Sequence, residues 1–197
     1  MRRGIAIILA SALVLVPGCR KAKLLSQNLN VENKVAVRPI VVFYEAPTLL
    51  LAAEKRNVAL PQNPAGALSV VVRELVKGSA NPSLPPLLPA DTVVRSAFLL
   101  PDGTAFVDFG GPTLTGGWGT GTHRELMAIY SVVQTVTANF PEAKRVRILI
   151  NDEPAETLAG HISLARALAP IPSLVAAGAP APLTAPAVAP GAMATSR

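Results

Sequence analysis

The chain has 197 residues, and 18 Lys and Arg against 12 Asp and Glu give it a formal net charge of +6. Residues 37–168 carry 11 basic and 11 acidic side chains, so the excess positive charge lies at the two ends of the sequence. This distribution argues against nucleic-acid binding, which needs a basic surface on the folded part. One cysteine excludes an internal disulfide, and two histidines supply no evident zinc site.

The first residues of the chain predict secretion and lipid attachment. Arg2 and Arg3 precede an apolar run at 5–16, which is shorter than the roughly 20 residues that span a bilayer. A positive start and a short apolar run are typical of a secretory signal peptide. Residues 16–19, Val-Pro-Gly-Cys, resemble the lipobox of bacterial lipoproteins. We therefore expect a lipoprotein signal peptide at 1–18 and an acylated Cys19; the alternative is an ordinary signal peptide with an incidental cysteine.

The segment after Cys19 is predicted to be a basic membrane-proximal tether, residues 19–36. Arg20, Lys21 and Lys23 lie beside the acylated cysteine, where they are attracted to anionic lipid headgroups. Acyl chains combined with a basic patch hold a protein firmly at a membrane. The expected location is therefore extracytoplasmic, in the periplasm or at the outer cell surface, with membrane lipid as the first partner.

The predicted elements begin with a strand at 37–44, whose apolar run is continuous and therefore buried. Asn63 and Pro64 then form a helix start, with an N-cap and a first-turn proline, and Gly78 closes that helix. Four prolines make the connection at 81–89 irregular and stiff.

The second half of the domain starts with two β-rich segments, 92–100 and 104–109, around a hairpin turn. A glycine-rich loop at 110–121 leads to a helix that ends at Phe140, for which Thr122 and Glu125 match a capping box. The next elements are a strand at 145–150, a tight turn at Asn151 and Asp152, and a segment at 157–164 that is expected to pair back onto that strand. Residues 169–197 are rich in Ala and Pro and are predicted to be disordered.

Residues 37–168 thus predict one domain of ordinary size. The element order favours an α+β fold in which two helices pack on one face of a small mixed β-sheet. The other face of the sheet is expected to be partly open, where a partner can dock.

The domain resembles the GerMN family, which is named for sporulation and spore-germination proteins and also occurs in bacterial lipoproteins. The matching motifs recur in the family's order and lie at 88–92, 103–109, 125–135, 140–141, 146–150 and 158–162. The resemblance implies a fold similar to ring-building motifs and a role in extracytoplasmic scaffolding, with no known reaction. This chain carries one copy, whereas the sporulation members carry two, so the family name does not by itself assign a role in sporulation.

Three residues are candidates for chemistry or partner contact. Asp108 ends a strand before the glycine loop, where it is expected to accept hydrogen bonds from the loop backbone, and His161 is expected to be a hydrogen-bonded structural residue. A hydrolase that uses Asp108 and His161 is the less favoured alternative. Trp118 lies in the glycine loop, where it is either exposed for a protein, glycan or lipid partner or folded back over the sheet. The loop lacks the Gly-Lys-Ser/Thr ending of a nucleotide-binding loop.

The sequence therefore predicts a membrane-anchored, extracytoplasmic protein that acts as a scaffold or protein-binding module in a cell-envelope assembly. A binding module for a small molecule or cell-wall glycan is the alternative. No cofactor, metal ion, nucleic acid or enzymatic reaction is expected.

Overall fold

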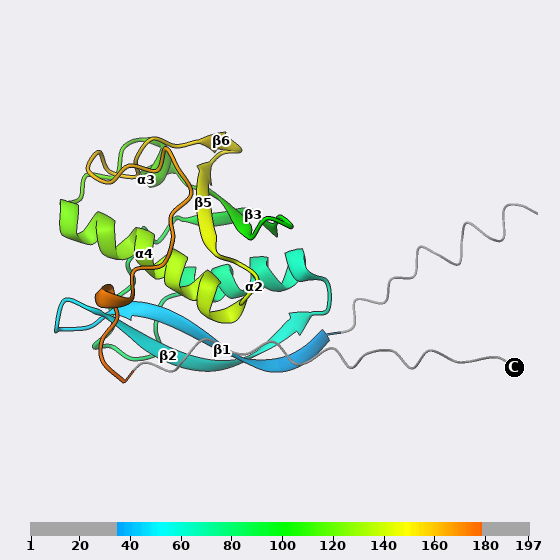
Figure 1. The fold of residues 1–197 in the computed structure, drawn as a ribbon. Helices are drawn as coiled ribbons and strands as arrows, with labels where there is room; N and C mark the ends of the chain where they lie inside the picture. The colour runs from blue at the N-terminus through cyan, green and yellow to red at the C-terminus, as the bar shows by residue number, and fades with distance from the viewer. Residues whose placement is uncertain (1–34, 179–197) are drawn as a thin grey trace, which may run out of the picture. The chain divides into compact units, whose positions relative to one another are not determined.

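The computed structural model describes residues 35–178, which form an α+β domain and confirm the predicted fold class. Two helices, α2 and α4, lie between a two-stranded ribbon and a four-stranded sheet (Figure 1). The element bounds are β1 Val35–Glu45, β2 Leu51–Pro61, α2 Pro64–Val76, β3 Val93–Leu99, β4 Thr104–Gly110, α3 Pro112–Thr115, α4 Thr122–Asn139, β5 Arg145–Ile150, β6 Glu153–Pro154 and the 3₁₀ turn η1 Pro172–Leu174.

The ribbon contains a strand that the sequence did not predict. β1 pairs antiparallel with β2, from Val35 opposite Pro61 to Glu45 opposite Leu51. Residues 40–44 of β1 are buried, as the continuous apolar run predicts, whereas its first five residues are exposed. The ribbon therefore extends beyond the core at the end where β1 begins.

The first helix forms where the sequence predicts it. The Asn63 side chain accepts a hydrogen bond from the Gly66 amide at 2.6 Å, which satisfies one of the free donors at the helix start. Gly78 has φ +87°, a left-handed conformation that glycine adopts without a steric penalty. The buried face of α2 repeats at helical spacing and comprises Ala67, Leu68, Val71, Val72 and Leu75.

The second sheet has the order β3-β4-β5-β6. β3 and β4 form the predicted hairpin, and β4 and β5 run parallel because α4 connects them. Asn151 and Asp152 have φ values of 54° and 66°, as the predicted tight turn requires. The expected return strand at 157–164 is wrong: residues 153–154 pair with β5 as β6, and residues 157–162 fold over the start of α4 instead.

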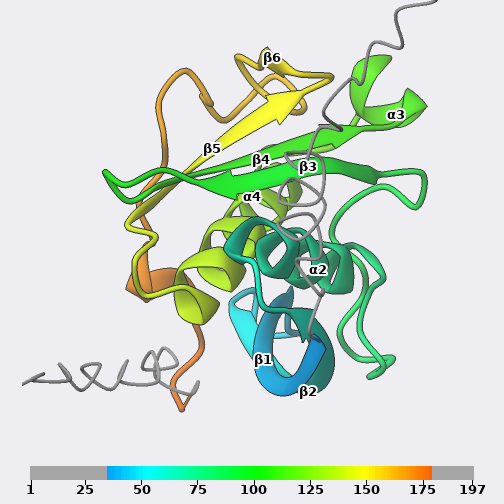
Figure 2. The same ribbon diagram turned by 90° about the vertical axis from the view of Figure 1, so that its right-hand side faces the viewer.

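Turned by 90°, the structure shows three layers (Figure 2). The four-stranded sheet lies above the helices, and the ribbon lies below them. Both helices therefore bury two faces, which explains why twelve of the residues in α4, from Glu125 to Ala138, are buried. The helix layer separates the ribbon from the four-stranded sheet, so β1 does not join the mixed sheet.

The predicted start of the disordered tail at residue 169 is wrong for residues 169–178. Ile171, Leu174 and Val175 pack against the core, and the Ala176 amide donates to the Leu51 carbonyl at 2.9 Å. Because these apolar side chains are separated by Ala, Pro and Ser, the composition of the segment did not indicate that it packs against the domain. The segment joins the sheet to the ribbon, because Leu168 pairs with Val146 and Val175 pairs with Leu51.

The predicted signal peptide at 1–18, most of the tether at 19–36 and Cys19 lie outside the described residues, as does the tail beyond residue 178. Within residues 35–178, no helix combines the length and apolar character needed to cross a bilayer.

Candidate functional site

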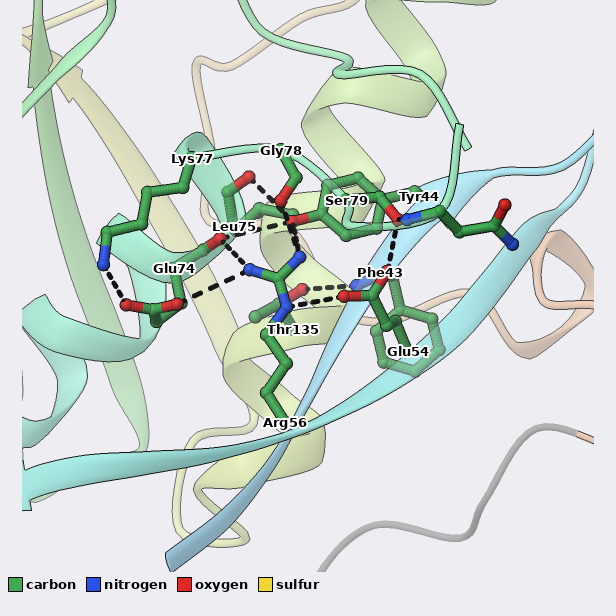
Figure 3. Close-up of polar contacts among 11 residues, drawn as sticks. Phe43, Tyr44, Glu54, Arg56, Glu74, Leu75, Lys77, Gly78, Ser79 and Thr135 are labelled. Atoms are coloured by element: carbon green, nitrogen blue, oxygen red, sulfur yellow. Dashed lines mark hydrogen bonds and ion pairs between the residues drawn. The ribbon is translucent and has the colours of Figure 1, made fainter. Parts of the chain in front are cut away.

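The most extensive polar cluster in the domain surrounds Arg56, a residue of β2 whose side chain reaches the end of α2 (Figure 3). Its Nε donates to Glu54 at 2.6 Å, and its terminal nitrogens donate to the carbonyls of Glu74 at 2.8 Å and Gly78 at 2.6 Å and to the Tyr44 hydroxyl at 3.0 Å. Helix C-terminal carbonyls lack partners within the helix, and a cation is favourable there. The cluster of Tyr44, Glu54, Arg56, Glu74 and Ser79 therefore fixes α2 to the ribbon.

The Arg56 cluster leaves little capacity for a ligand. Ser79 and Lys77 each bond to a carboxylate of the cluster, at Glu54 and Glu74. Burial raises the pKa of Tyr44 to about 12, against the opposing effect of the Arg56 charge. Because the Arg56 guanidinium already donates from all three of its nitrogens to partners inside the domain, its role is structural.

A second cluster is centred on Glu125, which is fully buried in the first turn of α4. One carboxylate oxygen accepts from the amides of Leu158 at 2.9 Å and Ala159 at 2.7 Å. The other accepts from the amides of His161 at 2.8 Å and Ile162 at 3.2 Å and lies 3.0 Å from His161 Nδ1. Glu125 thus holds the loop at 157–162 against the start of the helix.

These contacts correct the predicted capping box. The N-cap of α4 is Gly121, which has no side chain, and Glu125 bonds to the distant loop rather than to the Thr122 amide. Burial acts to raise the pKa of Glu125, but the bonds from Ala159, His161 and Leu158 lower it more, so that the pKa lies below its ordinary value. The carboxylate is therefore stabilised in its ionised form.

The sequence predicts a hydrogen-bonded structural histidine at position 161. In the structure, the His161 ring is hydrogen-bonded to Glu125. Among the described residues, neither a hydrogen bond nor an ion pair joins His161 to Asp108. His123 is exposed and lies 2.6 Å from a carboxylate oxygen of Glu45. The two histidines therefore make separate contacts, His123 with Glu45 and His161 with Glu125.

Asp108 is buried, but the predicted contact with the glycine loop is wrong. Its carboxylate accepts from Arg95 Nε at 2.9 Å and from the Asp152 amide at 2.9 Å. Arg95 also donates to the Asp152 side chain at 2.6 Å, and this bond lowers the pKa of Asp152. Asp108 bonds across the sheet because parallel β4 and β5 end at the same edge, which places the 151–152 turn beside it.

The glycine loop contains the short helix α3, which Asp91 caps through the Thr113 amide at 2.8 Å. A side chain at Gly111, whose φ is +137°, would approach the Asp91 carbonyl to 2.6 Å, so glycine is required there. Trp118 is half-buried and packs against the core. The structure thus places it in the folded-back arrangement rather than as a fully exposed contact.

The open site of the domain is a groove of about 500 Å³ between the start of the ribbon, the start of α2 and the end of α4. Its apolar walls include Ile40, Leu60 and Phe140, and polar groups line it at Arg38, Asn139 and Glu142. A cavity of this size with apolar walls and few polar groups is typical of a binding site. The sequence missed this groove because it depends on β2, which was not predicted. We call it the β1–α4 groove.

Within residues 35–178, no group of three or more His, Cys, Asp or Glu side chains is arranged to hold a metal ion.

Solved structures with a similar fold include the following three. A candidate lipoprotein from Clostridium perfringens shares 17% identity at a TM-score of 0.50, over 72% of this chain and 94% of that protein. The tandem GerMN domains of the sporulation protein GerM from Bacillus subtilis share 21% identity at a TM-score of 0.44, over 66% of this chain and 44% of that protein. The first GerMN domain of the same protein shares 20% identity at a TM-score of 0.44, over 71% of this chain and 98% of that structure. No match was found among curated proteins.

The family comparison agrees with the motifs in the sequence. Residues 41–156, more than half of the chain, match the model of the Germane family, described as sporulation and spore germination. The matched region runs from β1 to the segment after β6 and so includes Arg56, Asp108 and Glu125. The chain therefore belongs to the Germane family, whose domain is GerMN.

Proposed function

We propose that this protein is a lipid-anchored, extracytoplasmic scaffold whose GerMN domain binds another protein of the cell envelope. One observation supports this most: the polar side chains that suggested chemistry are bound inside the domain, whereas the β1–α4 groove is open. Such a groove can bind a partner without any reaction.

The lipid anchor is supported by the sequence and by one structural relative. Arg2 and Arg3, the apolar run at 5–16 and Cys19 follow the order of a lipoprotein signal. The similar Clostridium perfringens protein is itself described as a candidate lipoprotein. The basic residues after Cys19 would add electrostatic attraction to an anionic membrane surface.

Absence of catalysis is part of the proposal. A hydrolase would need a carboxylate or imidazole within hydrogen-bond reach of its substrate. Asp108 is already bonded to Arg95 and the Asp152 amide, and His161 is already beside Glu125. These contacts support a structural role for both residues, in which each holds a loop in place.

The anchor is tested by replacing Cys19 with serine in the full chain. We expect Cys19→Ser to move the protein from the membrane fraction to the soluble fraction, because no acyl chain can be attached. Ser26→Ala, in the same tether, is the matched control and should remain with membranes. Membrane partition that is equal in the two variants would exclude lipidation at Cys19.

The binding role is tested by chemical crosslinking in intact membranes, followed by purification of the full chain and identification of its adducts. We expect the same envelope protein in repeated experiments, with a lower yield from Cys19→Ser. The absence of any reproducible adduct would contradict the scaffold proposal.

A further inference from the structure

The outer edge of β1 is occupied by side chains along only part of its length. Asn139 acts there as a substitute for a neighbouring strand, because its Oδ1 accepts from the Val41 amide at 2.9 Å and its Nδ2 donates to the Val41 carbonyl at 2.6 Å. The Thr135 hydroxyl accepts from the Phe43 amide at 3.1 Å. From Val41 onward, α4 therefore closes this edge.

The same edge is open before Val41. In an antiparallel pair, successive residues direct their backbone groups alternately toward and away from the partner strand. The register of β1 with β2 is uninterrupted, so Val35 and Val37 face outward like Val41 and Phe43. Among residues 35–178, no group bonds to the outward amides and carbonyls of Val35 and Val37. Their side chains are 57% and 72% exposed.

The β1–α4 groove adjoins this open edge. Asn139 bonds to the edge and lines the groove, and Pro39 and Ile40 line it from β1. A strand added to an edge directs alternate side chains to one face. Side chains on the Ile40 face of an added strand would therefore enter the groove.

The charge at the edge limits the identity of the added strand. Arg38 is exposed, lies on the same face as Ile40 and has no carboxylate partner among the described residues. Residues that pair across two strands have side chains on the same face, where opposite charges attract. A second copy of β1 fits poorly, because its own Arg38 would bring a second positive charge and its own Pro39 would remove a second amide from the pairing.

We propose that the edge at Val35–Pro39 binds an extended segment of another protein as an added strand, with an acidic residue beside Arg38 and an apolar residue in the β1–α4 groove. This inference rests on the proposed binding function and specifies its site. Backbone hydrogen bonds supply the attachment, while the groove and Arg38 select the side chains, as in other strand-addition complexes.

The test uses the ¹⁵N-labelled full chain in lipid nanodiscs and the capped peptide Thr-Leu-Thr-Glu-Thr-Leu-Thr as the probe. Leucine lies two residues from glutamate on both sides, so the probe fits in either strand direction. We expect NMR shifts centred on Val35, Val37, Ile40 and Phe140, and slower amide exchange at Val37. Shifts centred on Trp118, or none at all, would overturn the proposal.

Three substitutions separate the contribution of backbone hydrogen bonds to binding from that of charge. Val37→Pro removes one outward amide without removing a hydrogen bond to β2. Proline already occupies position 39, where the backbone also faces outward. We expect Val37→Pro to weaken binding of the probe at least tenfold. Val37→Thr keeps the amide and should bind as the native chain does. Arg38→Glu should reverse the preference, so that a probe with lysine in place of glutamate binds better. Equal binding by Val37→Pro and Val37→Thr would contradict strand addition.

Other occupants give different results. Self-association in sedimentation that Val37→Pro abolishes would assign the edge to a second copy. Probe binding that occurs only after deletion of residues 179–197 would assign it to the chain's own tail. Either result overturns the proposal. If membrane crosslinking captures an envelope protein equally from Val37→Pro and Val37→Thr, the edge proposal is wrong while the scaffold function stands.

Discussion

At the scale of single residues, buried charges in this domain connect segments that are distant in sequence. Glu125 accepts hydrogen bonds from backbone amides more than 30 positions later in the chain, and Asp108 accepts one from the amide of Asp152. A carboxylate with several amide donors is stable in a buried site because the lost hydration is replaced. The sequence indicated polar residues at these positions, but the partner segments depend on tertiary folding.

Replacement of Glu125 by glutamine should make the free energy of unfolding less dependent on pH in the acidic range. The glutamine amide group would face backbone donors, so Glu125→Gln should lower the free energy of unfolding by about 2 kcal/mol at neutral pH. The native pKa lies below its ordinary value of 4.5. The stabilising contribution of the charge is therefore present above that value and is lost as pH falls through the folded-state pKa.

Urea unfolding at a series of pH values measures this effect. The stability difference between native protein and Glu125→Gln should shrink on acidification. Glu153→Gln, an exposed substitution in β6, is the control and should stay within about 0.5 kcal/mol of the native protein. If the stability difference between the native protein and Glu125→Gln is the same at neutral and acidic pH, the negative charge of Glu125 does not contribute to the stability of the folded protein.

The two tyrosines should resist ionisation in the folded protein. Burial raises the pKa of Tyr44 to about 12 and also raises that of Tyr130. Because the folded-state pKa exceeds the ordinary value of 10.0, the protonated tyrosines contribute stability below pH 10, and this contribution is lost as pH rises through the folded-state pKa. Absorbance at the tyrosinate band should stay low through pH 10. A full rise there, with native circular dichroism, would contradict the buried geometry.

At the scale of elements, the sequence predicts those with strong local signals. Asn63, Pro64 and Gly78 mark both ends of α2, and the hairpin of β3 and β4 follows from its turn residues. β2 lacks such a signal, since its residues 54–57 are Glu, Lys, Arg and Asn and three of its apolar residues are alanine. It forms a strand because it pairs with the strongly apolar β1, and Arg56 is useful there through its contact with α2.

Removal of the Arg56 guanidinium should detach the end of α2 from the ribbon. Arg56→Ala removes the cation beside Glu54 and the donors to the carbonyls of Glu74 and Gly78, so we expect the free energy of unfolding to fall by about 3 kcal/mol. Arg56→Lys keeps the charge but not the fork of donors, so its loss should be intermediate. Lys55→Ala, on the same strand and exposed, should change stability by less than about 0.5 kcal/mol.

Thermal or urea unfolding of these three variants gives the order directly, and hydrogen exchange in residues 74–78 gives the location. Equal stability of Arg56→Ala and Lys55→Ala would show that the cluster does not hold α2.

At the scale of the whole molecule, two helices covered on both sides leave the open surfaces at the periphery. The sequence predicted an uncovered part of the β structure for docking, and the α+β fold class is confirmed. The position of the β1–α4 groove was not predictable, because it combines residues of β1, β2, α2, β3 and α4. The unsatisfied edge of β1 lies beside this groove, at the end of the ribbon where β1 begins.

Site-specific photocrosslinking in intact membranes tests the binding role most directly. A photoreactive residue replaces either Val37 or Leu49 in the full chain; both are exposed aliphatic residues of the ribbon, and Leu49 lies in the turn between β1 and β2. We predict that position 37 yields one reproducible adduct with an envelope protein and that position 49 does not. No adduct at position 37, or the same adducts from both positions, would contradict the account.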